Sequence, residues 1–285
     1  MTSTLAFDHG DPQISATLHE WRLRFQNESS LGYSDSYGGF YVASRHADIA
    51  AIAKGTENFS SAQGITIPPL ANPVPSIPAE SDPPMHRHYR AVLQEYLTPA
   101  AVRRYEDDIC ALVTEAIDSF IEKGKADLIT DLAAQIPTMA TAQVFGFNRE
   151  NAVRFDRGFR AVVEASGTDV ERQIRAVEEF IGFLKEQVEN AKANPGDDVI
   201  SAIVAFDAHG QNFTEQECLG LLWSVAGAAT DTTRHAIGHT LYHVHESPGV
   251  RQQLIDDPSL IPSVVEECLR LEAPAFMTAR TAVKE

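Results

Sequence analysis

A chain of 285 residues that is 44% hydrophobic can form a sizeable apolar core. Its formal net charge of -17 argues against nucleic acid or an anionic membrane surface as a partner. The first residues lack a basic segment followed by an apolar run, so neither a signal peptide nor a membrane anchor is predicted there. Isolated cysteines, odd in number, fit a reducing compartment, and we expect a cytoplasmic protein.

The first eighty residues predict short helices around a small β portion. Apolar residues recur with helical spacing over 12–28, and a turn cluster between 31–33 and 40–42 predicts a β-hairpin. A short helix is expected at 45–54. Five prolines fall within 64–78, which indicates an irregular loop. Long loops in compact domains often cover a substrate.

The next helix carries a pair of potential cations near its start. Asp82 is predicted as the N-cap, with Pro83 in the first helical position. His86 and Arg90 lie four residues apart and therefore share a face. Together with the positive end of the helix they predict a site for a carboxylate or phosphate. The alternative is an ordinary solvated basic turn.

Helical patterns separated by short linkers continue through the middle of the chain. Short linkers predict a single, mainly α domain over 1–285 with a small β portion. The expected elements are helices at 100–123, 129–145, 150–165, 170–193 and 197–206, and a short strand at 126–128.

The longest periodic stretch is 214–246, which predicts one helix of about 50 Å. Thr214 is a suitable N-cap, and Glu217 is its capping-box partner. No charge occurs from Cys218 to Thr230, so this half of the helix should be buried. Thirteen uncharged residues fall short of the ~20 that a bilayer requires, so a core helix is expected rather than a membrane span.

An acid and three threonines interrupt this apolar helix at 230–233, directly after the small residues 226–229. A carboxylate such as Asp231 is costly in an apolar setting unless it is paired or hydrated. Threonine hydroxyls can bond to carbonyls four residues earlier, here those of Ala228 and Ala229, and loosen the helix. The pattern predicts a gap that holds water, an acid and an alcohol beside a flat wall. Alternatively, a helix begins here after a buried strand, with Asp231 or Thr232 as its N-cap.

Two shorter helices are expected at 248–256 and 262–271. Glu267 and Arg270 lie three residues apart on the second helix, opposite its apolar stripe. From spacing alone they form an exposed pair worth a few tenths of a kcal/mol.

Three histidines follow each other at intervals of four, at His235, His239 and His243. Such spacing suits zinc, but these residues lie opposite the apolar stripe and lack the glutamate of an HExxH motif. A solvated polar face is the simpler interpretation, and no metal site is predicted in this chain.

Together, these stretches resemble the soluble bacterial branch of the cytochrome P-450 superfamily. Residues 228–233 (AATDTT) are similar to the family's oxygen-activation motif, with Ala229 in place of the usual glycine. Residues 267–270 (ECLR) resemble its ExxR motif. Residues 82–90 (DPPMHRHYR) resemble the DPPxHxxxR helix, whose histidine and arginine hold haem propionates. Arg280 resembles a further propionate arginine.

The resemblance implies a cytochrome P-450 fold, haem b, and a monooxygenase that takes electrons from NAD(P)H through a ferredoxin or flavodoxin-type partner. An apolar small-molecule substrate is expected, and the Glu267–Arg270 pair should be buried. The implied site residues are Asp231 and Thr232 for proton delivery; His86, Arg90 and Arg280 for the propionates; Ala228 and Ala229 for the oxygen groove; and Phe276, Thr278 and Val162 for the substrate pocket beneath loop 64–78.

The chain departs from the family at the haem ligand. The family's ligand cysteine lies far beyond the ExxR motif, and Cys110, Cys218 and Cys268 lack its sequence context. We therefore expect residues 1–285 to be the N-terminal portion of such an enzyme, truncated after the ExxR helix and inactive alone. The alternative is a non-catalytic helical module that binds an apolar ligand without redox chemistry.

Overall fold

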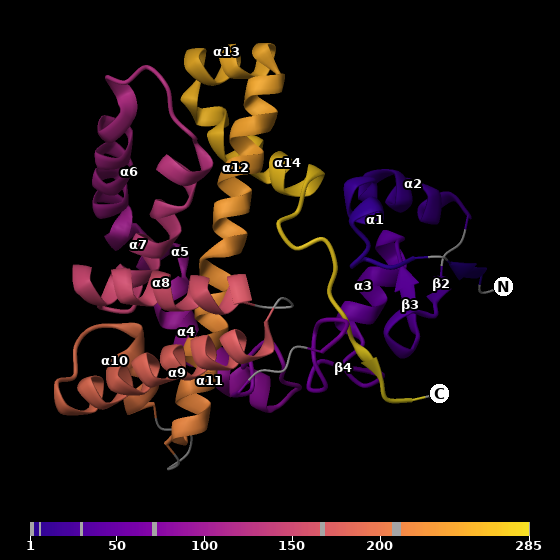
Figure 1. Cartoon of the computed structure of the whole chain (residues 1–285), viewed down its shortest axis with the longest axis horizontal. Helices are drawn as coiled ribbons and strands as arrows, with labels where there is room; N and C mark the ends of the chain where they lie inside the picture. The colour runs from indigo at the N-terminus through magenta and orange to yellow at the C-terminus, as the bar shows by residue number, and fades with distance from the viewer. Residues whose placement is uncertain are drawn as a thin grey trace. The chain divides into compact units, whose positions relative to one another are not determined.

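Figure 1 shows the computed structural model, which describes residues 3–5, 7–28, 31–69, 73–165, 169–206 and 212–284. The chain divides into two compact units. The smaller unit comprises Met1–Ala71, Glu80–Pro83 and Met277–Glu285, and the helical unit comprises Asn72–Ala79 and Pro84–Phe276. That both units form one domain stays a prediction.

The smaller unit contains two short sheets. Strand β1 (Ser3–Leu5) pairs in parallel with β2 (Leu31–Ser34), which pairs antiparallel with β3 (Phe40–Ala43). The predicted hairpin is thus confirmed. Its turn holds Tyr37 at a φ of 54°, and the glycines that follow also have positive φ. Strand β4 (Phe59–Ser60) pairs antiparallel with β5 (Thr281–Ala282).

The helices of the smaller unit are α1 (Pro12–Ala16), α2 (Leu18–Glu28) and α3 (His46–Lys54). The helix predicted over 12–28 is interrupted at Thr17, whose hydroxyl donates to the Gln13 carbonyl at 2.9 Å. Its apolar stripe is confirmed, because Ile14 and Phe25 are buried in one cluster with the aromatic rings of Phe7 and Phe40.

The helical unit is built from α4 (Met85–Leu97), α5 (Pro99–Val102), α6 (Glu106–Ile121), the π-helical turn η3 (Ile129–Ala133), α7 (Gln135–Val144), α8 (Arg149–Ala165), α9 (Val170–Ala193), α10 (Val199–Ala205), α11 (Glu215–Ala229), α12 (Asp231–Glu246), α13 (Pro248–Asp256) and α14 (Ile261–Leu271). The mainly α class is confirmed. Among the described residues, no helix combines the length and apolar character needed to cross a membrane.

The strand predicted at 126–128 is absent from this described segment. The Asp127 carboxylate accepts the backbone amides of Ile129 and Thr130 at 2.9 and 3.1 Å. These bonds lead into η3, which begins at Ile129, so the local hydrogen bonding favours a turn over an extended strand.

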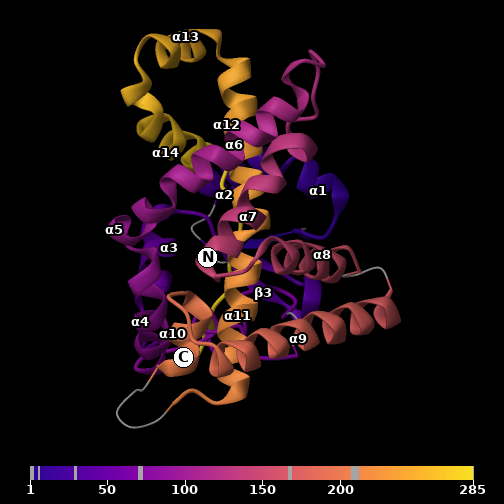
Figure 2. The same cartoon turned by 90° about the vertical axis from the view of Figure 1, so that its left-hand side faces the viewer.

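The core of the helical unit is rich in aromatic side chains. Figure 2 shows α8 and α9 side by side, and Phe155 of α8 packs against Phe180 of α9 with ring centroids 5.8 Å apart. Trp223 of α11 extends this cluster. Leu221 and Leu222 are fully buried, which confirms that the uncharged half of the central stretch lies in the core.

The start of α4 differs from the prediction. Asp82 is not its N-cap, because the helix begins at Met85 with Pro84 in the cap position and no side-chain bond. The Asp82 carboxylate instead accepts the Ser60 hydroxyl at 2.5 Å and the Ser61 amide at 2.8 Å, within the smaller unit. These bonds lower the pKa of Asp82. The sequence pattern predicted that the Asp82 carboxylate would cap α4, but it bonds instead to residues more than twenty positions earlier in the chain.

Candidate functional site

The central stretch is interrupted where the acid and threonines occur. Helix α11 ends at Ala229, Thr230 has φ -87° and ψ -69°, and α12 begins at Asp231. The prediction of a single continuous helix over 214–246 is therefore wrong, because the helix is interrupted at Thr230. The alternative, a helix start at this point, agrees better with the structure, because α12 does begin at Asp231. However, a helix and not a strand precedes α12, and the Thr230 side chain does not cap it.

Threonine hydroxyls explain the interruption. Thr230 donates to the Ala226 carbonyl at 3.0 Å, and Thr232 donates to the Ala228 carbonyl at 2.5 Å. Hydroxyls in these positions compete for helical carbonyls and bend the helix. The predicted bond to the Ala228 carbonyl is confirmed, and the contact made by Thr230 was missed.

Asp231 is not an isolated acid in an apolar setting, which corrects the expectation from the sequence. Its carboxylate pairs with Arg234 one turn later, and 30% of its side chain is exposed. Arg234 follows Asp231 by three residues, so it lies on the same face of the helix and can form an ion pair with the carboxylate. Nearby, Ala226 is buried whereas Ala228 is exposed.

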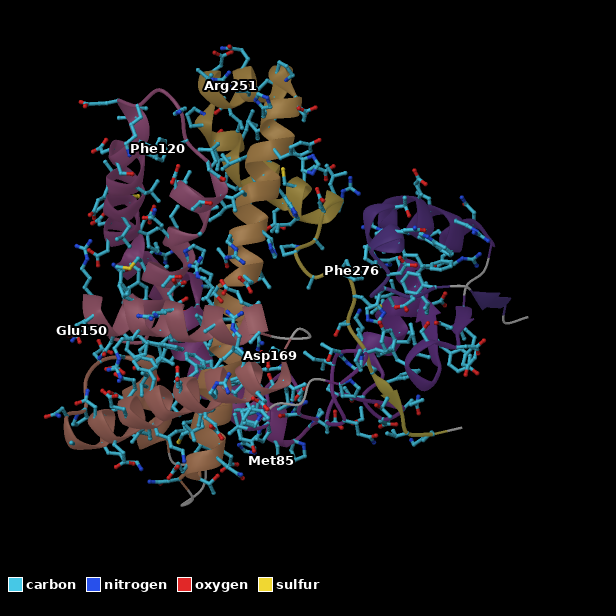
Figure 3. The ribbon with its side chains drawn as sticks, in the orientation of Figure 1. Met85, Phe120, Glu150, Asp169, Arg251 and Phe276 are labelled. Atoms are coloured by element: carbon cyan, nitrogen blue, oxygen red, sulfur yellow. The ribbon has the colours of Figure 1, made fainter. Side chains whose placement is uncertain are left out.

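The three residues expected to line the substrate pocket are divided between the two units. Val162 of α8 is buried within the core of the helical unit. Phe276, labelled in Figure 3, lies on the segment after α14, and its side chain is half exposed. Thr278 belongs to the smaller unit. Their role in a common pocket therefore stays a prediction.

The loop expected over 64–78 is irregular where it is described, and residues 70–72 lie outside the described part. Its first half belongs to the smaller unit and its second half to the helical unit. In the second half, Val74 and Ile77 are buried in the helical core. The role of this loop as a roof over a substrate remains a prediction.

The residues expected to hold propionates also divide between the units. His86 and Arg90 lie on α4, with His86 partly buried and Arg90 exposed. Arg280 lies in the smaller unit, where it donates to the Ala279 carbonyl at 2.6 Å and to the Thr278 hydroxyl at 3.3 Å. The convergence of these three side chains stays a prediction.

A contact missed from the sequence joins α4 to the central helix. The buried Tyr89 hydroxyl, between His86 and Arg90 in sequence, donates to Glu217 at 2.7 Å across 128 residues. Burial, followed by the nearby Glu217 carboxylate, raises the pKa of Tyr89 to about 12. Glu217 also completes the predicted capping box with Thr214, which is confirmed. No local sequence signal links Tyr89 with Glu217.

The Glu267–Arg270 pair is present: the Arg270 guanidinium donates two hydrogen bonds of 2.7 Å to the Glu267 carboxylate. Its side chains are 55% and 66% exposed, so the burial implied by the resemblance is wrong for this chain. Helix α14 packs on α12 and buries Cys268, whereas the charged pair lies elsewhere on its surface. The bond from Arg270 lowers the pKa of Glu267.

The three histidines His235, His239 and His243 make specific contacts and are not simply a solvated polar face. His243 Nε2 lies 3.0 Å from a carboxylate oxygen of Glu272, and His239 Nδ1 lies 3.3 Å from the Glu272 carbonyl. His235 stacks on His239. Within the described part of the chain, no group of three or more His, Cys, Asp or Glu residues is placed to hold a metal ion.

Curated relatives and solved structures point to one family. No protein-family model matches the chain. It is 30% identical to cytochrome P-450 130 of Mycobacterium tuberculosis, over 86% of this chain and 63% of that protein. It is 29% identical to erythromycin C-12 hydroxylase of Saccharopolyspora erythraea, over 94% of this chain and 68% of that enzyme.

Solved structures match the fold. Mycobacterium marinum cytochrome P-450 CYP268A2, in complex with pseudoionone, superposes with a TM-score of 0.86 at 22% identity, over 98% of this chain and 72% of that one. CYP109Q5 from Chondromyces apiculatus gives 0.85 at 24% identity, over 100% and 72%. The chain belongs to the cytochrome P-450 superfamily. It spans 63% of the length of the Mycobacterium tuberculosis relative.

Proposed function

We propose that the complete protein containing this chain is a haem-dependent monooxygenase. The observation that carries the proposal is the interruption of the central helix, where Asp231 and the back-bonded Thr232 follow a wall of small residues. A family member with an acid and an alcohol at such a break has the groups needed to move protons to a reacting oxygen atom.

The residues of the helical unit are compatible with a haem. His86 and Arg90 lie on successive turns near the N-terminus of α4, and neither forms an ion pair with another described residue. Cationic side chains at a helix N-terminus suit a carboxylate, so these two would hold propionates, with Arg280 as a third donor. When bound, the haem would supply the oxygen-activating chemistry.

The chain's own residues would leave room for the reacting oxygen and transfer protons to it. Ala228 and Ala229 would leave room beside the helix, because no longer side chain projects there. Thr232 would be held in place by its bond to the Ala228 carbonyl, and Asp231 by its pair with Arg234. In this proposal the Thr232 hydroxyl releases the Ala228 carbonyl, transfers its proton to the reacting oxygen and regains a proton from Asp231.

The substrate and electron source belong to the same proposal. We infer a small-to-medium apolar substrate bordered by Val162, Phe276 and Thr278. One relative is named linalool 8-monooxygenase and another erythromycin C-12 hydroxylase, and these names support a small organic substrate. Electrons would come from NAD(P)H through a ferredoxin or flavodoxin-type protein. A cytoplasmic setting agrees with three free cysteines.

The test uses the complete protein, loaded with haem and supplied with redox partners and NAD(P)H. The Thr232→Ala variant should bind substrate as the unmodified protein does, while diverting reducing equivalents from product to peroxide. Thr240→Ala is the matched control, because Thr240 makes the same kind of bond to the Ala236 carbonyl two turns later. Thr240→Ala should keep product per NAD(P)H unchanged.

Two results would contradict the proposal. A complete protein that binds apolar ligands but forms no oxygenated product would favour the non-catalytic binding module. Full coupling in Thr232→Ala would remove this hydroxyl from the mechanism and direct attention to the neighbouring Thr233.

A further inference from the structure

A cavity of ≈ 390 Å³ in the helical unit lies between α6, α7 and α8. Clefts that hold small organic ligands usually measure about 300–1,000 Å³. None of the residues proposed above to hold haem, border the substrate or transfer protons lines this cavity. If it binds a ligand, it is therefore a second site.

The apolar part of the lining comes from three helices, with Leu112 and Ala116 on α6, Ile136 and Met139 on α7, and Val153 on α8. Ala116 is buried, whereas Val153 is 57% exposed, so this wall runs from the core to the solvent. An aliphatic side chain that is open to water is stabilised when an apolar group covers it. The wall can thus hold the carbon skeleton of an organic molecule.

An arginine with unused hydrogen-bond donors lies at the inner end of the cavity, next to the buried Thr138. Arg160 donates from Nη2 alone to the two carboxylate oxygens of Asp156, at 2.7 and 2.8 Å. The Thr138 hydroxyl donates to the same carboxylate at 2.7 Å. Within the described ranges of the chain, Nε and Nη1 of Arg160 make no hydrogen bond. Because a guanidinium has five N–H donors, Arg160 can still donate to an oxygen atom of a ligand.

The charges of the lining favour an uncharged ligand. At the exposed end of the cavity, Arg149 of α8 lies 3.7 Å from Glu115 of α6. Together with Arg160 and Asp156, this pair brings the lining to two positive and two negative side chains, and hence to no net charge. A ligand carboxylate at Arg160 would lie beside the Asp156 carboxylate and be repelled by it. A neutral oxygen can accept from Arg160 without that repulsion.

We propose that this cavity binds an uncharged, largely apolar small molecule. Its carbonyl or hydroxyl oxygen accepts a hydrogen bond from Arg160, and its carbon skeleton packs on Leu112, Met139 and Val153. The apolar contacts supply most of the affinity, and the arginine fixes the orientation of the ligand. This binding site does not depend on the monooxygenase function proposed above.

Met139 provides a reporter inside the cavity. The chain has four methionines, so carbon-13 labelling of their methyl groups gives a simple NMR spectrum, and Met139→Leu identifies the Met139 signal. The probes are 2-decanone and decanoate, which have the same chain length and differ in charge. Titration of residues 1–285 with 2-decanone should shift the Met139 signal to saturation and leave that of Met85, on α4, in place. Decanoate should bind at least about fivefold more weakly. No saturable shift of Met139 up to the solubility limit of 2-decanone would overturn the proposal, and tighter binding of decanoate would overturn the uncharged class of ligand.

Two substitutions, each with a matched control on the same helix, locate the ligand. Val153→Trp should fill the cavity and abolish the shift, whereas Val163→Trp should preserve it, because Val163 is an exposed valine of α8 that does not line the cavity. Arg160→Met should weaken binding of 2-decanone about tenfold, since a charged donor is lost. Arg154→Met should leave the affinity unchanged, because Arg154 pairs with Glu186 outside the cavity. Equal affinities of the Val153→Trp and Val163→Trp variants would overturn the location, and unchanged affinity in Arg160→Met would overturn the role of the arginine.

The same titration of the complete, haem-loaded protein shows whether the cavity stays open there. Binding beside the haem is followed separately through the Soret band. 2-Decanone should shift the Met139 signal as it does in residues 1–285, and Val153→Trp should remove this shift without altering the Soret response. A response that is lost in the complete protein would show that another part of that protein fills the cavity, and would overturn the proposal. A complete protein that forms no oxygenated product would refute the monooxygenase function, and the Met139 titration would still decide this site.

Discussion

The bond between Tyr89 and Glu217 should contribute measurably to the stability of the helical unit. It joins the helix that carries His86 and Arg90 to the first turn of α11. The Tyr89→Phe substitution removes only the hydroxyl and keeps the buried ring. We expect it to lower the free energy of unfolding of residues 1–285.

The expected magnitude follows from the surroundings of the bond. A hydrogen bond to a charged group contributes ~1.5–3 kcal/mol. The Glu217 carboxylate is only partly buried and keeps its two bonds from Thr214 at 2.7 and 2.8 Å, so the lower end applies. Tyr89→Phe should therefore cost about 1.5 kcal/mol. The Glu217→Gln substitution should cost a similar amount, because it removes the charge but keeps an acceptor.

The pH dependence of this effect has a definite sign. Burial acts to raise the pKa of Glu217, but hydrogen bonds from the Thr214 amide, the Tyr89 hydroxyl and the Thr214 hydroxyl together lower it below 4.5. A carboxyl whose pKa is lowered by folding adds stability above its unfolded value. That stability is lost as the pH falls through the folded value. The difference between the unmodified chain and Glu217→Gln should thus shrink below about pH 4.5.

Urea unfolding followed by circular dichroism measures these changes, and the double variant tests the pair directly. The two substitutions together should cost about 1 kcal/mol less than the sum of their separate effects, because Tyr89→Phe removes the bond that Glu217→Gln weakens. Additive effects would show that Tyr89 and Glu217 act independently. A change below ~0.3 kcal/mol for Tyr89→Phe would refute the assigned contribution of the bond.

Three further predictions concern packing, haem retention and the cysteines. Gly220→Ala should destabilise the chain by ~1–3 kcal/mol in urea unfolding, because the added Cβ would lie 2.4 Å from the Pro75 carbonyl oxygen. Gly182→Ala should instead stabilise the chain by about 0.5–1 kcal/mol, because a Cβ at Gly182 would meet no other atom. Equal effects of the two substitutions would contradict the close approach at Gly220. In the complete protein, Arg90→Leu should speed haem transfer to apomyoglobin, and His243→Ala should not. Residues 1–285 mixed with haem, reduced and exposed to carbon monoxide, should lack the red-shifted Soret band of thiolate ligation, because Cys110, Cys218 and Cys268 lack the sequence context of the family's haem ligand. A clear thiolate band would refute this.

Local patterns predicted most helices well because their causes are local. The capping box at Thr214 and the apolar stripe through Ile14 and Phe25 appear where spacing placed them. Failures arose where side chains took distant or competing partners. Asp82 bonds to Ser60 instead of capping α4, and Asp127 begins a turn where a strand was expected.

The candidate site was predictable in kind but not in detail. Threonines in an apolar helix predicted loosened hydrogen bonding, and the break at Thr230 agrees with that interpretation. The pairing of Asp231 with Arg234 was overlooked although both lie on one helical turn. The contact of Asp156 with Thr138 depends on how α7 and α8 pack, and no spacing within either helix encodes it.

The path of the chain through its two units has a consequence for synthesis on the ribosome. Strand β5 pairs with β4 inside the smaller unit, yet 220 residues separate Ser60 from Thr281. Because translation proceeds from the N-terminus, β4 must wait for its partner until the entire helical unit has been made. A nascent chain released early, at any point before Thr281, would leave that strand edge open to pairing with other chains.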